Sequence, residues 1–161
     1  TIVDLLFLTL NIQPWFRNIG KRLVKSPKAY LMESNLVSYV LKKSLREIER
    51  NDPTLFGHVL ENFVATELLK QISEPLHLSG LHHFRTADGK EVDFVIERGE
   101  TIVAVEVKAA DAITQRDCIG MFELQNLTGK DFVCGVVLYR GRHILKLADK
   151  IYAVPLSVMW G

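Results

Sequence analysis

The chain has 161 residues, 48% hydrophobic and 24% charged, which is a typical composition for one folded domain or one domain with a small appendage and argues against disorder. The longest apolar run, FVCGVVLY, is far shorter than the roughly 20 residues of a membrane helix, and LLFL is too short and has the wrong flanks for a signal peptide. The net charge of +1 is uneven: residues 1–50 hold nine Lys/Arg and four Asp/Glu, and residues 51–161 hold eleven and fifteen. This split predicts a basic N-terminal arm and a carboxylate-rich body.

The first fifty residues are expected to contain short helical and strand elements around a basic loop. The segment up to residue 15 is typical of a helix end running into a strand that stops at Pro14. A basic loop over 17–28 should follow, then a short strand over 29–32 and a helix capped by Ser34 or Asn35. The polar run SLREIERNDP, which ends at Pro53, is the best internal boundary. We therefore predict two parts, residues 1–50 and residues 51–161.

The second part alternates helical and strand patterns. A helix is predicted over 57–72, where Leu60, Val64, Leu68 and Ile72 recur on one face. Strands are predicted over 91–96 and in VAVEVKAA, joined by an Arg98-Gly99 turn. A helix over 112–127 and the apolar strand 132–139 imply a parallel crossover, and short strands in HILKL and IYAV precede a closing helix after Pro155. The fold class is α/β, a mixed sheet with helices on its faces.

The two central strands bring carboxylates together. With Arg98-Gly99 as the loop, Glu97 faces Glu100 and Asp93 faces Ala104, so Asp93 and Glu106 are diagonal neighbours with Cβ atoms about 7 Å apart. Period two puts both residues, with Glu91 and Lys108, on one face. Two adjacent carboxylates repel unless a proton or cation lies between them, and hard oxygen ligands suit Mg²⁺ or Mn²⁺.

A third carboxylate, Glu61, lies on the helix face that carries Ala65, Leu68 and Ile72 and is expected to turn towards the sheet. It could reach the same metal, while Lys108 could orient a water molecule. The simpler alternatives are a surface ion pair for the Glu-x-Lys motif, a turn-side charge for Asp93, and a salt bridge from Glu61 to Lys108.

The ordered set Glu61, Asp93, Glu106 and Lys108 resembles the PD-(D/E)xK nuclease superfamily, although Val92 stands where the motif has proline. That resemblance implies a restriction-endonuclease-like α-β-β-β-α-β core. It also implies that Asp93 and Glu106 bind the metal with help from Glu61, and that Lys108 assists the attacking water.

A further resemblance covers nearly the whole chain: NIGKRLVKSPKAYL, GHVLENFV, GKEVDFVIE and VAVEVKAA are similar to domain of unknown function 4143, found at the C-terminus of bacterial and archaeal AAA-type ATPases. It implies a winged-helix-like remnant with a basic linker arm over 1–50 and a nuclease-like domain over 51–161. Where that family has Asp-Ser/Thr-Gly-Leu, this chain has Glu33-Ser34-Asn35-Leu36. No GxxxxGK(S/T) motif is present, and the chain starts at Thr1. An ATPase domain is therefore expected upstream, in a longer parent protein.

The basic arm is a candidate nucleic-acid contact, with aromatic side chains between its charges. A solvated loop with an aromatic anchor in the core is the alternative. The basic residues are Arg17, Lys21, Arg22, Lys25 and Lys28, and the aromatic ones Trp15, Phe16 and Tyr30.

Weaker candidates complete the set. His82 and His83 suggest a metal but lack a third ligand nearby, and Gln115 and Arg116 could touch a DNA backbone. Cys118 and Cys134 lack metal-type spacing and are expected as buried thiols in a reducing cytoplasm.

We expect a Mg²⁺- or Mn²⁺-dependent DNA phosphodiesterase, partnered by DNA and by the AAA-type ATPase of its own parent chain, with no membrane association. The alternatives are a non-cleaving nucleic-acid-binding or ATPase-coupled domain, or a protein-interaction module.

Overall fold

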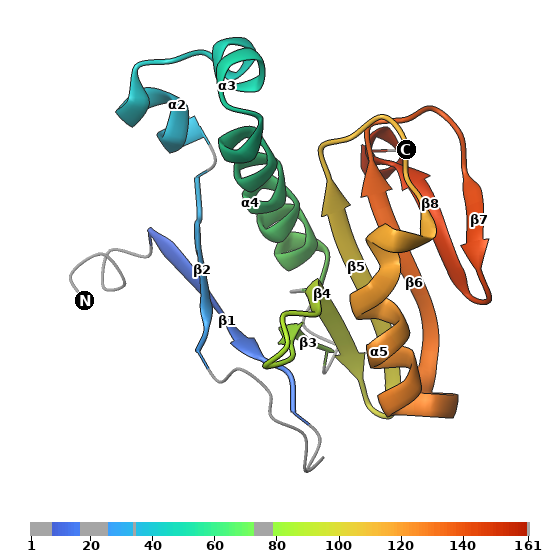
Figure 1. Cartoon of the computed structure of the whole chain (residues 1–161). Helices are drawn as coiled ribbons and strands as arrows, with labels where there is room; N and C mark the ends of the chain where they lie inside the picture. Colours follow the sequence, from blue (N-terminus) through green and yellow to red (C-terminus); the bar gives the residue numbers. More distant parts are fainter. Residues whose placement is uncertain (1–7, 17–25, 34, 73–78, 161) are drawn as a thin grey trace.

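The computed structural model describes residues 8–16, 26–33, 35–72 and 79–160. It has an eight-stranded mixed sheet in the order β2-β1-β3-β4-β5-β6-β8-β7 (Figure 1). The strands are β1 (Thr9–Pro14), β2 (Lys28–Leu31), β3 (Ser79–Arg85), β4 (Glu91–Arg98), β5 (Thr101–Lys108), β6 (Phe132–Tyr139), β7 (Leu145–Ala148) and β8 (Ile151–Pro155). The helices are α2 (Asn35–Leu41), α3 (Leu45–Asn51), α4 (Pro53–Ile72) and α5 (Ile119–Thr128), with short 3₁₀ turns at Gln115–Cys118, Gly129–Asp131 and Leu156–Trp160.

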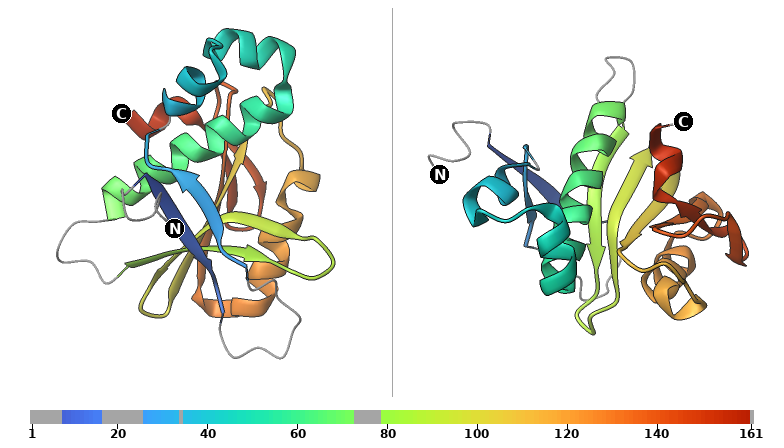
Figure 2. Two further views of the ribbon diagram at one scale, coloured as in Figure 1. Left: turned by 90° about the vertical axis from the view of Figure 1, so that its left-hand side faces the viewer. Right: turned by 90° about the horizontal axis from the view of Figure 1, so that it is seen from above.

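Helices α4 and α5 cover opposite faces of the central strands (Figure 2). Each helix has its own apolar core. On the α4 side, Val64, Ala65 and Leu68 pack with Phe94 and Val105 of the sheet. The α5 side contains Met121 and Leu124 of α5, packed against a larger buried set from the sheet and its flanks: Trp15, Phe84, Val92, Val95, Ile102, Ala104, Phe132, Val137 and Ile151. The alternation of Phe94 with Val95 explains how one strand supplies both cores.

Most predicted elements are confirmed. The strand over 132–139 is β6, which is internal and parallel to β5 as the crossover argument required. Gly129 ends α5 with φ of 57°, a left-handed conformation that glycine adopts without strain. Strand β2 and helix α2 lie within one residue of their predicted positions.

Three expectations are corrected. The hairpin loop is Gly99-Glu100 rather than Arg98-Gly99, so Arg98 pairs with Thr101 and Val95 pairs with Ala104. Asp93 therefore does not face Ala104. This slip of two residues moves every pair along the strand but leaves each side chain on its face, because the side-chain period is two.

The other two corrections concern a strand and the length of a helix. Residues 79–85, for which no strand was predicted, form β3, and the polar run proposed as a boundary forms α3, which starts in a capping box of Ser44 and Glu47. The predicted helix over 112–127 is shorter, with a 3₁₀ turn at 115–118 leading into α5. The division at residue 50 stays a prediction, although β1 and β2 join the same sheet as the rest.

Candidate functional site

The predicted carboxylates meet where β4 and β5 stop pairing. The ladder ends at Phe94 and Val105, and beyond it carboxylate oxygens accept the hydrogen bonds of the backbone. Asp93 N donates to Glu106 Oε2 at 3.2 Å, and Val107 N donates to Asp93 Oδ2 at 2.9 Å. Both carboxylates are buried, each with 7% of the residue exposed. The Asp93 and Glu106 side chains thus each bond the backbone of the other's strand. The two residues are closer together than the diagonal neighbours that were predicted.

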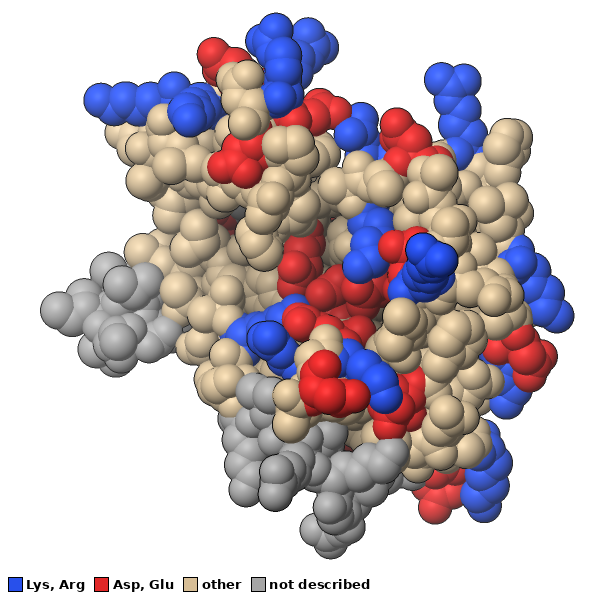
Figure 3. Space-filling model, in the orientation of Figure 1, with Lys and Arg blue, Asp and Glu red and all other residues tan. Residues whose placement is uncertain are grey.

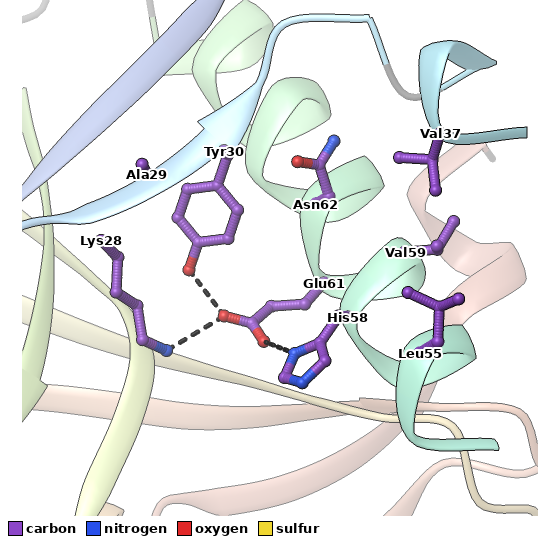
Figure 4. A pocket seen from close by; sticks show the side chains of 9 residues that line it. All are labelled: Lys28, Ala29, Tyr30, Val37, Leu55, His58, Val59, Glu61 and Asn62. Atoms are coloured by element: carbon purple, nitrogen blue, oxygen red, sulfur yellow. Dashed lines mark hydrogen bonds and ion pairs between the residues drawn. The ribbon is translucent and has the colours of Figure 1, made fainter. Parts of the chain in front are cut away.

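Glu61 of α4 reaches this point through Lys28 rather than through Lys108. Lys28 Nζ lies 3.0 Å from Glu61 Oε1 and 3.1 Å from Asp93 Oδ1, and it also pairs with Glu91 Oε1 at 2.5 Å. Tyr30 Oη donates to Glu61 Oε1 at 2.6 Å (Figure 4). Glu61 therefore faces the sheet as predicted, but its cationic partner comes from β2.

The strand that carries Lys28 is fastened to α4 by one amide side chain. Asn62 Oδ1 accepts from Leu31 N at 2.7 Å, and Asn62 Nδ2 donates to Leu31 O at 2.9 Å. The backbone N–H and C=O groups of Leu31 are thus both paired with the side chain of Asn62. It explains why Asn62 is buried and how β2 forms a wall of the site.

We call the place where β4 and β5 stop pairing the opening. On its other side, Lys108 Nζ donates to Glu106 Oε1 at 2.8 Å. These two side chains line a hollow of about 310 Å³ with Glu91, Arg116 and Asp117. Arg116 is thus at the site edge as predicted, whereas Gln115 turns away to bond Leu147 O at 2.8 Å. A second hollow of about 410 Å³ lies against Lys28, Tyr30, His58 and Glu61 (Figure 4). Figure 3 shows acidic side chains gathered in a depression at the centre of this face, with Lys and Arg around it.

Burial and mutual repulsion shift the protonation of the central pair. Burial, and then the charge of Glu61, raise the pKa of Asp93 to about 6. Burial, and then the charge of Asp93, raise the pKa of Glu106 to about 8. Two such carboxylates share either a proton or a cation.

The ammonium groups respond in the opposite sense. Burial disfavours the charged form of Lys28, but the charges of Asp93 and Glu61 outweigh it, so its pKa is raised. The same balance, with Glu106 as the main charge, raises the pKa of Lys108. Both lysines are therefore ammonium ions at neutral pH.

The donor chemistry of Asp93 and Glu106 fits a hard divalent ion, because both offer buried carboxylate oxygens whose charge is only partly compensated. Within the described part of the chain, no three His, Cys, Asp or Glu side chains are already grouped as metal ligands. The Lys28 ammonium stands between Glu61 and Asp93.

The other candidates fall mostly outside this site. Arg17, Lys21, Arg22 and Lys25 lie outside the described residues, which leaves Lys28 as the one placed member of the basic arm. Its side chain is turned into the carboxylate cluster, and the nucleic-acid contact of the basic arm stays a prediction.

Two of the aromatic residues are anchored in the core, as the alternative interpretation of the basic arm predicted. Trp15 is 1% exposed and packs edge-on against Phe84, and Tyr30 is buried against Phe94, while Phe16 is exposed.

The histidine pair and the cysteines have structural surroundings. His83 is buried with Nε2 at 3.0 Å from Ser26 O, and His82 approaches Glu97 at 4.0 Å. Cys118 and Cys134 are free thiols; Cys118 is buried as predicted, and Cys134 is half-buried. None of the described helices is long and apolar enough to cross a membrane.

The sequence did not predict the roles of Lys28, Tyr30 and Asn62. One signal was available for the first two: they alternate around Ala29 in KAY, so a strand puts both on the same face. Their partner could not be read from sequence, because Glu61 lies about thirty residues further along the chain.

Comparison with known proteins identifies the family. A domain of unknown function, DUF4143, matches residues 56–159. The chain belongs to the DUF4143 family. Lys28 and Tyr30 lie outside the matched DUF4143 residues, although both contact Glu61 within them.

Relatives in mycobacteria extend the match. The uncharacterised proteins Mb2031c of Mycobacterium bovis and Rv2008c of Mycobacterium tuberculosis are each 30% identical over 145 residues, or 90% of this chain. The chain spans 31% of the length of each. Among solved structures, an assembly of Thermococcus gammatolerans McrB AAA+ hexamers with bound McrC matches with a TM-score of 0.38 and 12% identity, over 62% of this chain and 27% of that one. A likeness at that level carries no conclusion here.

Proposed function

We propose that this DUF4143 domain is a divalent-metal-dependent nuclease that hydrolyses DNA phosphodiester bonds. The order α4-β3-β4-β5-α5-β6 agrees with the α-β-β-β-α-β core of restriction-endonuclease-like proteins. Glu61 lies on the helix, Asp93 on the second strand, and Glu106 and Lys108 on the third, which is the arrangement that the PD-(D/E)xK resemblance implies.

One observation carries the proposal. Asp93 and Glu106 are buried side by side at the strand opening, and Lys108 stands beside Glu106 with its side chain 34% exposed to an open hollow. Buried paired carboxylates destabilise a fold unless a proton or a cation lies between them, and such pairs cluster at functional sites. An ammonium within reach of solvent is placed to contact a phosphate.

Each residue then has a role. Asp93 and Glu106 would hold the metal. Glu61 of α4 would help to position Asp93 through Lys28, whose ammonium contacts both carboxylates. A bound Mg²⁺ or Mn²⁺ supplies Lewis-acid chemistry and a water molecule of lowered pKa. Lys108, fixed by its bond to Glu106, orients that water and offsets charge developing on the phosphate.

The wider context is part of the same proposal. The resemblance to AAA-type ATPase C-termini suggests that the nuclease acts with an ATPase of its own parent chain. The length of the mycobacterial relatives, of which this chain spans 31%, supports a larger parent.

A second candidate is a domain that binds nucleic acid or couples to the ATPase without cleavage. The observation in its favour is the Lys28 ammonium, which neutralises Glu61, Glu91 and Asp93 from within the chain. A cluster that is already paired needs a metal less.

The test is cleavage of a labelled DNA panel, comprising single strand, duplex, flap and four-way junction, with Mg²⁺ or Mn²⁺. Lys108→Ala should reduce the rate by about 100-fold or more. Lys146→Ala removes a lysine from the exposed edge strand β7 and should match wild type. No metal-dependent cleavage by wild type, or equal cleavage by Lys108→Ala, would support the second candidate instead.

A further inference from the structure

Lys28 occupies an unusual position for a lysine on an edge strand. Its ammonium contacts carboxylates from two elements, Glu61 of α4 and both Glu91 and Asp93 of β4, all within 3.1 Å. Only 22% of its side chain is exposed. Lys28 and Tyr30 converge on the same carboxylate group of Glu61 (Figure 4).

The ammonium is held in place rather than loosely paired. Strand β2 is bound to β1 on one side and to α4 through Asn62 on the other. Tyr30, two residues further along β2 and on the same face, is buried and hydrogen-bonded to Glu61. Burying a long side chain in this way costs conformational entropy, so the position is specified by the fold.

Removal of this ammonium would leave three carboxylates close together. Of the neighbouring basic side chains that the structure describes, Arg85 approaches Glu91 at 3.7 Å and His58 approaches Glu61 at 3.9 Å, and both are far more exposed than Lys28. The three oxygens around Nζ lie between 2.5 and 3.1 Å from it, which is slightly wider than the roughly 2.3–2.6 Å of a Ca²⁺–oxygen bond. Small side-chain movements would convert the cradle of the ammonium into that of a metal ion.

We propose that Lys28 is a resident cation of the site, standing where a second divalent ion would otherwise lie between Glu61 and Asp93. The site then takes one metal ion, at Asp93 and Glu106 beside Lys108. Lys28 is a positioning residue, because it acts on the site through Asp93 and Glu61. This inference rests on the proposed function for the place of the first ion, but it is tested by a difference between two variants.

The measurement is the number of Mn²⁺ or Ca²⁺ ions bound per chain, by titration calorimetry on the 161-residue chain. Lys28→Met keeps an unbranched side chain one atom shorter and removes the charge, and it should bind one ion more than wild type. Lys28→Arg keeps the charge and should bind as wild type does. Lys70→Met removes an exposed ammonium that pairs with Glu67 at 2.6 Å on α4, and it should change nothing.

Thermal unfolding gives an independent readout. In a chelator, Lys28→Met should melt below wild type, because three carboxylates have lost their shared cation. Saturating Ca²⁺ should then raise its Tm at least ~3 °C more than it raises that of wild type. If Lys28→Met does not fold in chelator, the neutral but polar Lys28→Gln replaces it in both measurements.

The two proposals fail in different ways. Equal ion numbers in wild type and Lys28→Met, with equal Tm gains, would overturn the resident-cation role whatever the nuclease assay shows. Two ions in wild type would overturn it as well. An additional ion in Lys28→Met, with no metal-dependent cleavage by wild type, would support Lys28 as the resident cation and contradict the nuclease.

Discussion

The two sides of the β4–β5 opening differ in how the negative charge of their buried carboxylates is compensated. On the α4 side, the carboxylates of Glu61, Glu91 and Asp93 share the ammonium of Lys28, and only 22% of that side chain is exposed. On the α5 side, Glu106 has the ammonium of Lys108 alone, and that side chain is 34% exposed to an open hollow. The carboxylates of the first side are paired internally through one shared ammonium, whereas Glu106 on the second side is paired with a lysine that is more exposed.

This difference indicates on which side an external cation or phosphate would meet the least compensated charge. The pKa of Glu106 is raised to about 8 although Lys108 contacts it, so its charge is poorly compensated. The pKa of Glu91 is lowered, since Lys28 more than offsets its burial. An acidic cluster is therefore not uniform, and its reactive edge is the one with the fewest internal partners.

The largest expected effect comes from Asp93, which both sides share. Asp93→Asn keeps the size of the side chain and should weaken Mn²⁺ binding by about 100-fold or more, since it removes a carboxylate ligand. Calorimetric titration measures this, with Asp149→Asn in the exposed β7–β8 turn as control. Unchanged affinity would place the metal away from the opening.

The α5 side depends on a close approach at Gly120. A Cβ atom built there would lie 1.8 Å from Glu91 O, so α5 would have to move away from β4. Gly120→Ala should lower the free energy of unfolding by about 2–3 kcal/mol. Gly57→Ala on α4 is the matched control, because its Cβ meets no atom within 4 Å, and it should raise stability by about 0.5–1 kcal/mol. Chemical denaturation gives both values; equal effects would deny the close packing of α5.

The α4 side depends on the Asn62 amide. Asn62→Ala leaves the N–H and C=O groups of Leu31 without these partners and should destabilise the chain by about 2 kcal/mol. It should also release β2 and with it Lys28, which faster amide hydrogen exchange in residues 28–31 would show. Asn126→Ala, on the exposed face of α5, is the control. Unaltered exchange in β2 would mean that the Asn62 amide is not needed to hold the strand, which β1 and the bonds of Lys28 and Tyr30 to Glu61 also support.

A pH dependence of the metal-free chain is expected as well. The pKa of Glu106 is raised from 4.5 to about 8, so between these values the folded chain retains a proton that the unfolded chain has lost. The free energy of unfolding should therefore fall from pH 5 to pH 8, by on the order of a few kcal/mol. Denaturation in chelator at pH 5, 6.5 and 8 measures it. Glu106→Gln should flatten the profile, and Glu100→Gln in the β4–β5 loop should not; a profile that rises in wild type would reverse the argument.

Much of the candidate site was predictable because its parts are local. The alternation in EVDFVIE and VAVEVK places Asp93, Glu106 and Lys108 on β4 and β5, and the helical period turns Glu61 towards the sheet. The error in the hairpin loop did not move these residues to another face, because a slip of two residues preserves the alternation.

The contacts across the chain were not predictable from such patterns. Lys28 was assigned to nucleic acid because it ends a basic run, yet the fold turns it into the carboxylate cluster. Strand β3 was missed because its sequence, SGLHHFR, does not alternate cleanly between apolar and polar residues. Its place in the sheet comes from pairing with β1 and β4.

The sequence by itself determined which carboxylates and which lysine share one face of β4 and β5, because residue type and period within one strand or helix are local properties. The tertiary structure decided how these charges are paired. Packing of β2 against α4 brings Lys28 to the carboxylates on one side, while Lys108 on the other side lines the hollow beside α5. Such pairing depends on which distant segments come within about 3 Å of each other, and only the folded chain sets that distance.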